Sequence, residues 1–225
     1  MSVRLVIFDC DGVLIDSEAV ANRVSAEAIG ELGWRLTAAE CEQRFLGMSL
    51  ADMGRAIAAA RGIAVPAAWE ARLVVRLAEA LGRDAVTVPG AEAALRAVAA
   101  MGFEWRIASN SGVAELAAKF AATGLAALVA GRVHSAETVI ARGGRGKPAP
   151  DLFLEAAHAA GVTPSYCVVV EDSIPGVRGA VAAGMRCLGF APHGDGAALH
   201  AAGAEPFHAL AALPALLAAG RVGAP

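Results

Sequence analysis

Four short apolar runs recur along the chain, and each is short enough and ends abruptly enough to be a buried β-strand. They comprise residues 5–8, 105–108, 167–170 and 186–190. Between them lie alanine-rich stretches whose spacing favours helices, at residues 91–100, 113–122, 151–160 and 175–183. Alternating strands and helices predict an α/β fold, in which helices cover both faces of a doubly wound parallel sheet.

An inserted segment interrupts this alternation after the first strand. It contains four stretches with helical patterns, at residues 17–32, 37–45, 49–61 and 66–81. Thr37 and Glu40 predict a capping box at the second stretch. Ser17 can cap the first stretch, and Pro66 fits the first turn of the fourth. We therefore expect an α/β core domain of residues 1–16 and 87–225, with a small inserted α-helical domain of residues 17–86.

Composition and charge narrow the class of protein. The 225 residues include 19 Lys and Arg against 22 Asp and Glu, so the formal charge is −3 and nucleic-acid binding is not expected. No apolar run approaches the ~20 residues of a membrane-spanning helix, and the first residues lack the layout of a signal peptide. We expect a cytoplasmic protein with no membrane partner. The four cysteines are scattered without zinc-ligand spacing, which favours buried thiols.

Two pairs of carboxylates follow predicted strands. Asp9 and Asp11 end the first strand, and Glu171 and Asp172 end the third. Ligands of open α/β sheets bind at the carboxyl edge, where these side chains meet if the two strands are neighbours. Clustered acids repel one another without a cation, and Mg²⁺ prefers carboxylates, water and phosphate oxygens. An EF-hand calcium loop does not fit, because Val13 stands where its third acid belongs.

Two further segments offer groups that bind anions. Ser109 and Asn110 follow the second strand and precede a helix, and the hydroxyl and backbone N–H groups at a helix start can bind phosphate. Lys147 lies in a proline-stiffened loop before another helix. A P-loop is excluded there, because Pro148 replaces its Ser or Thr. Taken singly, these residues are more often a helix cap and a solvated lysine.

The motifs D-x-D-G, S-N, K-P-x-P and E-D-S occur in this order over nearly the whole chain. In that order they resemble the haloacid dehalogenase-like hydrolase superfamily, in its branch of phosphatases and β-phosphoglucomutases. The resemblance implies a Rossmann-like core, and the helical insert is similar to the small α-helical cap of that superfamily. Within the phosphatases, the cap and Cys10 look most like the bacterial 6-phosphogluconate phosphatase subgroup.

The resemblance implies chemical roles for the acids. Asp9 would attack phosphorus and form an aspartyl-phosphate. Asp11 would protonate the leaving oxygen and then activate water. A Mg²⁺ ion would contact the carboxylates of Asp9 and Asp172 and the backbone carbonyl of Asp11. Glu171 would contact this ion directly or through water.

The resemblance also implies substrate contacts. Ser109 and Lys147 would hold the phosphoryl oxygens, and the backbone of Asn110 would add a donor. The turn at residues 45–49 is similar to the substrate-facing turn of the superfamily's cap, and charged residues on the flanking helices could meet the rest of the substrate. The candidate substrate residues of the insert are Glu18, Arg23, Arg44, Gly47, Met48 and Ser49.

Three functions are compatible with these motifs. The leading one is a Mg²⁺-dependent phosphatase that hydrolyses a small phosphorylated metabolite, such as a sugar phosphate or a phosphorylated sugar acid, as a monomer or weak homo-oligomer. The second is a sugar-phosphate mutase of the β-phosphoglucomutase type, but Ala21 and Leu50 stand where those enzymes carry a cap histidine and arginine. The third is a receiver-type phosphoryl-accepting domain. Two features count against it, because the acceptor of a receiver domain follows the third strand and a receiver domain has no helical insert.

Overall fold

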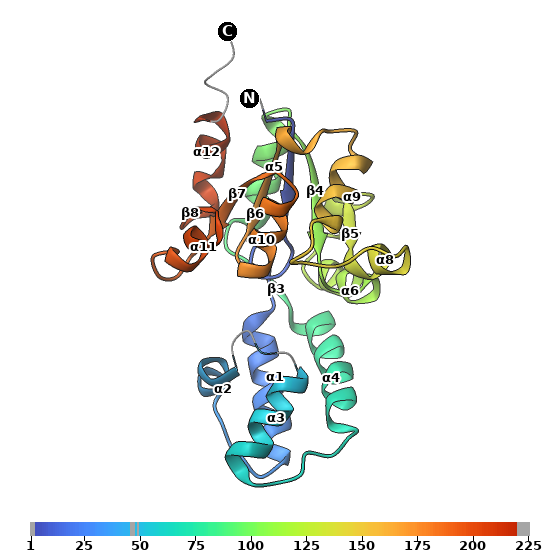
Figure 1. The fold of residues 1–225 in the computed structure, drawn as a ribbon, viewed down its shortest axis with the longest axis vertical. Coiled ribbons are helices and arrows are strands. Elements are labelled where there is room, and N and C mark those ends of the chain that lie inside the picture. The colour runs from blue at the N-terminus through green and yellow to red at the C-terminus, as the bar shows by residue number, and fades with distance from the viewer. Residues whose placement is uncertain (1–2, 46–47, 49, 220–225) are drawn as a thin grey trace. The chain divides into compact units, whose positions relative to one another are not determined.

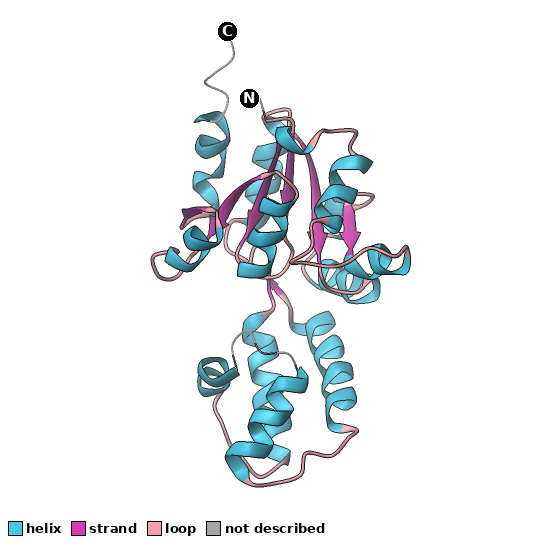
Figure 2. Ribbon diagram, viewed as in Figure 1, coloured by secondary structure: helices cyan, strands magenta, loops and turns pink. Residues whose placement is uncertain are grey.

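The computed structural model describes residues 3–45, 48 and 50–219. The chain forms two compact units: Met1–Asp16 together with Val86–Pro225, and Ser17–Ala85. The first unit contains a parallel sheet and its helices, whereas the described residues of the second unit form helices and their connections (Figure 2).

The sheet of the first unit has six strands. They are β1 (Leu5–Phe8), β4 (Glu104–Ser109), β5 (Val133–Ser135), β6 (Cys167–Glu171), β7 (Arg186–Phe190) and β8 (Glu205–Phe207). Their order is β5-β4-β1-β6-β7-β8, and every neighbouring pair is parallel (Figure 1). The chain extends the sheet from β1 to one edge and then returns to extend it to the other. This arrangement confirms the predicted doubly wound sheet.

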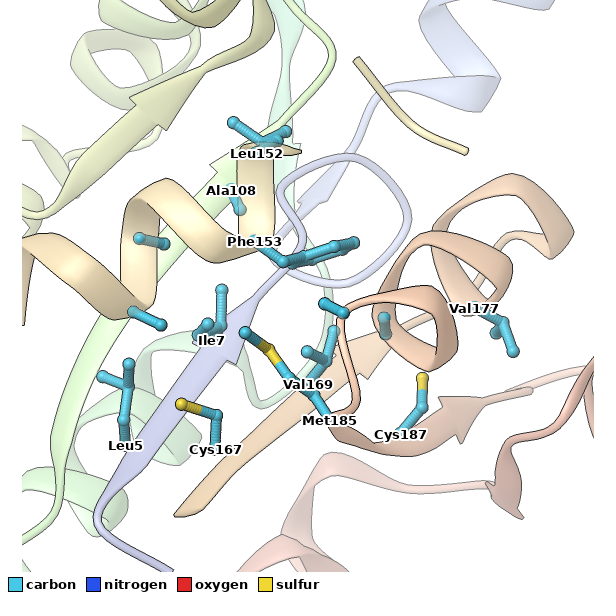
Figure 3. Packing of buried hydrophobic residues seen from close by; sticks show 14 of the residues in the cluster. Leu5, Ile7, Ala108, Leu152, Phe153, Cys167, Val169, Val177, Met185 and Cys187 are labelled. Carbon is cyan, nitrogen blue, oxygen red and sulfur yellow. The ribbon is translucent and has the colours of Figure 1, made fainter. Parts of the chain in front are cut away.

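Helices cover this sheet because its central strands are apolar on both faces. Every residue of β1 is buried. Leu5 and Ile7 pack in a cluster that includes Phe153 (Figure 3), and Val6 and Phe8 alternate toward the opposite face. The helices are α5 (Ala91–Ala100), α6 (Val113–Ala122), α7 (Ala126–Val129), α8 (Ala136–Ala141), α9 (Asp151–Ala159), α10 (Ile174–Ala182), α11 (Ala197–Ala202) and α12 (Leu213–Ala219), with 3₁₀ turns at Pro164–Tyr166 and Leu210–Ala212.

The sequence analysis does not predict some of the strands of the first unit. β5 and β8 are the two edge strands and have three residues each, which is too short for a period of two to be visible. A separate antiparallel pair, β2 (Ile15–Asp16) and β3 (Val86–Thr87), forms where the chain leaves and re-enters the unit. Val86, which we expected in the insert, therefore lies in a strand of the first unit.

The described residues of the second unit form four helices that pack around their own apolar core. They are α1 (Glu18–Glu31), α2 (Ala38–Phe45), α3 (Leu50–Arg61) and α4 (Trp69–Asp84). Ile29, Ile57 and Leu73 are buried in one cluster from three of these helices. The indole N–H of Trp69 in the same cluster donates to the carbonyl oxygen of Ala28 at 3.3 Å, so this large side chain is buried with its polar atom paired.

The helix starts of this unit agree only in part with the sequence. The Thr37–Glu40 capping box is confirmed: the backbone N–H of Glu40 donates to Thr37 Oγ1 at 3.2 Å, and that of Thr37 donates to Glu40 Oε2 at 2.8 Å. Ser17 was expected to cap α1 but makes no side-chain capping bond, because its backbone is already helical. Pro66 was expected in the first turn of α4, which instead begins at Trp69 after a turn closed by Trp69 N and Pro66 O at 2.8 Å.

Two further observations concern the chain as a whole. In the part that the structure describes, no helix has both the length and the apolar character needed to cross a membrane. All four cysteines are buried free thiols, as predicted.

Candidate active site

The three central strands of the sheet bring the sequence motifs together. Phe8 at the end of β1 pairs with Ile107 of β4 and Val170 of β6, so the loops that follow these strands start side by side. Asp9 follows Phe8, and its backbone N–H donates to Val170 O at 2.9 Å. The condition that the sequence left open, that the first and third predicted strands are neighbours, is therefore met.

Asp9 is buried, and its carboxylate accepts a hydrogen bond from a lysine. Lys147 Nζ donates to Asp9 Oδ1 and, at 2.6 Å, to Glu171 Oε1. Burial, opposed by the charge of Lys147 and reinforced by Glu171 and Asp11, raises the pKa of Asp9 to about 7. Burial lowers the pKa of Lys147, but the two carboxylates outweigh it and hold that pKa above its usual range, so Lys147 is charged.

Three carboxylates form a cluster that can hold a metal ion. One oxygen from each of Asp9, Glu171 and Asp172 lies within 4.8 Å of the other two. Gly12 permits this close approach, because its φ of +77° favours glycine and a Cβ there would lie 1.8 Å from Asp172 Oδ2. Asp9 and Glu171 are buried and Asp172 is half-buried, and carboxylates at this separation need positive charge beyond one lysine. An all-oxygen set fits a hard divalent cation such as Mg²⁺.

Glu171 is held rigidly by the loop that follows β6. Its side chain is fully buried, and Oε2 accepts from the backbone N–H of Asp172 and of Ser173, each at 3.0 Å, and from the Ser173 hydroxyl at 2.9 Å. Gly176 lies directly over this carboxylate, where a Cβ would be 1.8 Å away. Both Glu171 oxygens thus have protein donors, and the residue anchors Lys147 within the cluster.

The Asp11 side chain has its own set of partners. Ser111 Oγ donates to Asp11 Oδ2 at 3.0 Å, and Lys119 Nζ donates to Asp11 Oδ1 at 2.6 Å. Glu115, one turn before Lys119 on α6, forms an ion pair with the same ammonium. The sequence analysis missed this role of Lys119. The available signal was composition, because the chain has 17 arginines and only two lysines, Lys119 and Lys147.

Ser109 and Asn110 lie at the same edge, at the end of β4. Ser109 is 1% exposed, and its Oγ accepts from the backbone N–H of Ser111 at 3.1 Å. The Asn110 side chain clamps the Lys147 peptide: Oδ1 accepts from Lys147 N at 2.9 Å, and Nδ2 donates to Lys147 O at 3.2 Å. The Asn110 side chain thus fixes the loop that carries Lys147, and the contact of the Asn110 backbone N–H with phosphate stays a prediction.

The two candidate arginines of the second unit have partners within that unit. Arg23 donates to Asp84 at 2.5 Å and to Glu27 at 3.3 Å. The Arg44 guanidinium lies 5.3 Å from the ring centroid of Trp34. The sequence predicts that either arginine could meet an anionic substrate group, and in the structure the charge of Arg23 is balanced by two acids.

The remaining candidates of the second unit divide into two groups. Glu18 is exposed at the start of α1, and Met48 is 44% exposed. Gly47 and Ser49 lie outside the described residues.

Comparison with known proteins gives the family. The model of the haloacid dehalogenase-like hydrolases matches residues 3–184. Among curated proteins, the chain is 35% identical over 189 residues to a probable pseudouridine-5'-phosphatase of Drosophila melanogaster, covering 81% of this chain and 79% of that protein. It is 28% identical over 195 residues to the 6-phosphogluconate phosphatase of Escherichia coli, covering 85% of each. It is 32% identical to 190 residues of SUPPRESSOR OF QUENCHING 1 of Arabidopsis thaliana; this match covers 83% of the chain but only 18% of that longer protein.

Solved structures agree over the whole chain. A haloacid dehalogenase-like protein of Agrobacterium tumefaciens is 34% identical with a TM-score of 0.85, covering 97% of this chain and 99% of that one. A HAD family hydrolase of Deinococcus radiodurans with bound phosphate and sodium is 33% identical with a TM-score of 0.84, covering 99% of both chains. The buried Asp9, its lysine and the carboxylate cluster therefore lie in a protein that belongs to the haloacid dehalogenase-like hydrolase family.

Proposed function

We propose that the chain is a Mg²⁺-dependent phosphatase that hydrolyses a small phosphorylated metabolite through an aspartyl-phosphate on Asp9. The observation that carries this proposal is the buried Asp9 carboxylate, which accepts a hydrogen bond from the Lys147 ammonium and lies in a cluster with the carboxylates of Glu171 and Asp172. A carboxylate nucleophile needs positive charge around it to accept a phosphoryl group, and Lys147 together with a Mg²⁺ ion held by the cluster would supply that charge.

Asp9 and Asp11 share the chemistry in two steps. In the first, an Asp9 oxygen bonds to phosphorus while the bond to the leaving oxygen breaks, and Asp11 gives that oxygen its proton. In the second, Asp11 takes a proton from a water molecule whose oxygen attacks phosphorus, and the bond to Asp9 breaks. The Lys147 ammonium and the Ser109 hydroxyl hold the phosphoryl oxygens during both steps.

The carboxylate cluster supports the magnesium part of the proposal. Asp9 and Asp172, with the Asp11 backbone carbonyl, would hold the ion, and Glu171 would reach it through water because its own oxygens already accept from Lys147 and Ser173. Bound Mg²⁺ would neutralise charge on the phosphoryl oxygens and keep Asp9 ionised.

The substrate class rests on the relatives, whose names specify phosphatases of pseudouridine 5'-phosphate and 6-phosphogluconate. We propose a sugar phosphate or a phosphorylated sugar acid. Because Arg23 is already paired with Asp84 and Glu27, Arg44 is the better candidate to meet the carboxylate of a sugar acid. Arg44→Ala should then raise KM for 6-phosphogluconate by a larger factor than KM for an uncharged sugar phosphate.

Phosphate release tests the activity. Purified protein with Mg²⁺ is offered phosphorylated sugars, sugar acids and nucleotides, and at least one should be hydrolysed. Asp9→Asn should lower the rate by more than about 10³-fold, because the amide is of equal size but cannot attack phosphorus. Glu92→Gln on the exposed surface of α5, which also removes one negative charge, should have no effect.

A second arm of the assay separates hydrolysis from phosphoryl transfer between sugars. The protein is incubated with β-glucose 1-phosphate, a bisphosphate primer and Mg²⁺. Glucose 6-phosphate formed without net release of phosphate would replace the phosphatase with a mutase. Full activity of Asp9→Asn would refute the aspartyl-phosphate route.

A further inference from the structure

The chain has very few lysines, and both of them lie at the candidate active site. Of the 19 basic residues, 17 are arginine and two are lysine. Both lysine side chains are almost fully buried, with 4% exposure for Lys147 and 2% for Lys119. Each donates to one carboxylate of the D-x-D motif, Lys147 to Asp9 and Lys119 to Asp11. The proposed mechanism uses Lys147 and leaves Lys119 without a role.

Lys119 is enclosed by acceptors. Its ammonium donates to Asp11 Oδ1 at 2.6 Å and to Ser111 Oγ at 3.1 Å, and it forms an ion pair with Glu115 Oε1. Three acceptors match the three N–H groups of a lysine ammonium. Burial lowers the pKa of Lys119, but Asp11 and Glu115 more than offset it, so the pKa lies above its usual value and the side chain is charged.

The geometry fixes both oxygens of Asp11. Lys119 lies in the last turn of α6, so its Nζ is positioned by a helix rather than by a loop. Oδ1 accepts from this ammonium, and Oδ2 accepts from Ser111. The Ser111 hydroxyl also lies 2.9 Å from Glu115 Oε1, so it can donate to Glu115 when Asp11 carries a proton and to Asp11 when it does not.

We propose that Lys119 is a positioning residue, which with Ser111 holds the Asp11 carboxylate in the orientation required for proton transfer to the leaving oxygen. This inference rests on the proposed function, in which Asp11 is the general acid. A carboxylate with free rotation about χ1 and χ2 would reach that orientation only part of the time. Lys119 and Ser111 reduce this freedom before substrate arrives, so the proton is aligned when the P–O bond breaks.

The dependence of rate on the leaving group tests this role. A general acid matters for an alkyl phosphate, whose leaving alkoxide is strongly basic, and little for 4-nitrophenyl phosphate, whose leaving phenolate is stable without a proton. We would measure kcat/KM with both substrates, since this ratio reports the first chemical step. Lys119→Met keeps the length and apolar stem of the side chain and removes the ammonium. We expect kcat/KM to fall by about 10- to 100-fold for the alkyl phosphate and by less than about 3-fold for 4-nitrophenyl phosphate.

Three variants complete the design. Asp11→Asn should show the same selectivity for the alkyl phosphate with a larger loss. Thr123→Val is the matched control, because Thr123 follows the last residue of α6 and its hydroxyl donates to the carbonyl oxygen of Lys119 at 2.8 Å, not to Asp11. It should change both substrates equally and slightly. If Lys119→Met does not fold, as judged by circular dichroism, Ser111→Ala removes the other partner of Asp11 and should show the same selectivity.

The outcomes separate this inference from the proposed function. Equal losses on both substrates in Lys119→Met, or an unchanged or raised rate on the alkyl phosphate, would overturn the positioning role while the Asp11→Asn result stands. The same selective loss in Thr123→Val would assign the effect to the helix rather than to the ammonium and would also overturn it. Absence of a leaving-group effect in Asp11→Asn would instead remove Asp11 as the general acid, and with it the proposed mechanism.

Discussion

Replacing Gly176 by alanine would drive a methyl group into the carboxylate of Glu171. A Cβ on Gly176 would lie 1.8 Å from both Cδ and Oε1 of Glu171. Ordinary contact begins at 3.4 Å, so the carboxylate would have to move by 3.4 − 1.8 = 1.6 Å. It cannot do so within its present hydrogen bonds, because Oε1 accepts from Lys147 at 2.6 Å and Oε2 accepts from the Ser173 hydroxyl at 2.9 Å.

The cost of this shift has two parts. Forcing an extra methyl group into a packed interior costs about 1–3 kcal/mol. Each hydrogen bond to a charged group contributes about 1.5–3 kcal/mol, and at least one of the bonds from Lys147 and Ser173 must break. We therefore expect Gly176→Ala to lower the free energy of unfolding of the first unit by about 3 kcal/mol or more. Phosphatase activity should fall with it, because Lys147 loses the partner that holds it beside Asp9.

Urea denaturation followed by circular dichroism, together with phosphate release, measures both effects. Gly30→Ala is the control, since Gly30 lies in α1 with no atom within 4 Å of the added methyl group. Alanine is the better helix former, so this variant should be stabilised by up to about 1 kcal/mol. Two glycine-to-alanine changes in helices should thus have opposite signs. If the Gly176→Ala variant had the same urea midpoint and the same phosphatase activity as the wild type, this reasoning would be refuted.

Three further predictions concern charge, metal and capping. Burial, opposed by Lys147, raises the pKa of Asp9 from 3.8 to about 7. The folded state therefore binds this proton more tightly than the unfolded state does. In excess chelator, the free energy of unfolding should fall as pH rises from about 4 to about 7. Urea midpoints across this range should show the fall in wild type and not in Asp9→Asn. Chelation should abolish phosphate release, and added Mg²⁺ should restore it. Ca²⁺ should inhibit phosphate release, because its larger coordination number permits bidentate binding of Asp9. Equal rates of phosphate release with Mg²⁺ and Ca²⁺ would contradict this prediction. Thr37→Ala should lower the free energy of unfolding of the second unit by about 0.5–2 kcal/mol through loss of the capping box with Glu40, and an unchanged thermal midpoint would show that the box contributes nothing.

The sequence determined the features that depend on local pattern. Fully apolar runs of four residues bounded by polar residues, such as residues 5–8 and 167–170, are typical of buried parallel strands, and acids directly after such strands are expected at the carboxyl edge of the sheet. For this reason the fold class, the motif residues and the capping box of Thr37 were visible without coordinates. The edge strands β5 and β8 were not visible, because three residues carry no readable period and neighbouring strands supply their hydrogen bonds.

Only the tertiary structure decided which side chains meet. Lys119 lies 108 residues from Asp11, and Arg23 lies 61 residues from Asp84, yet each pair is in hydrogen-bond contact. From the sequence alone, Arg23 is a candidate substrate cation and Lys119 has no assigned role. Long-range packing places one beside the acid of the motif and neutralises the other with a partner in its own unit. Helical periodicity gives the face that a residue occupies, but the partner on that face depends on how the elements pack, which no local pattern encodes.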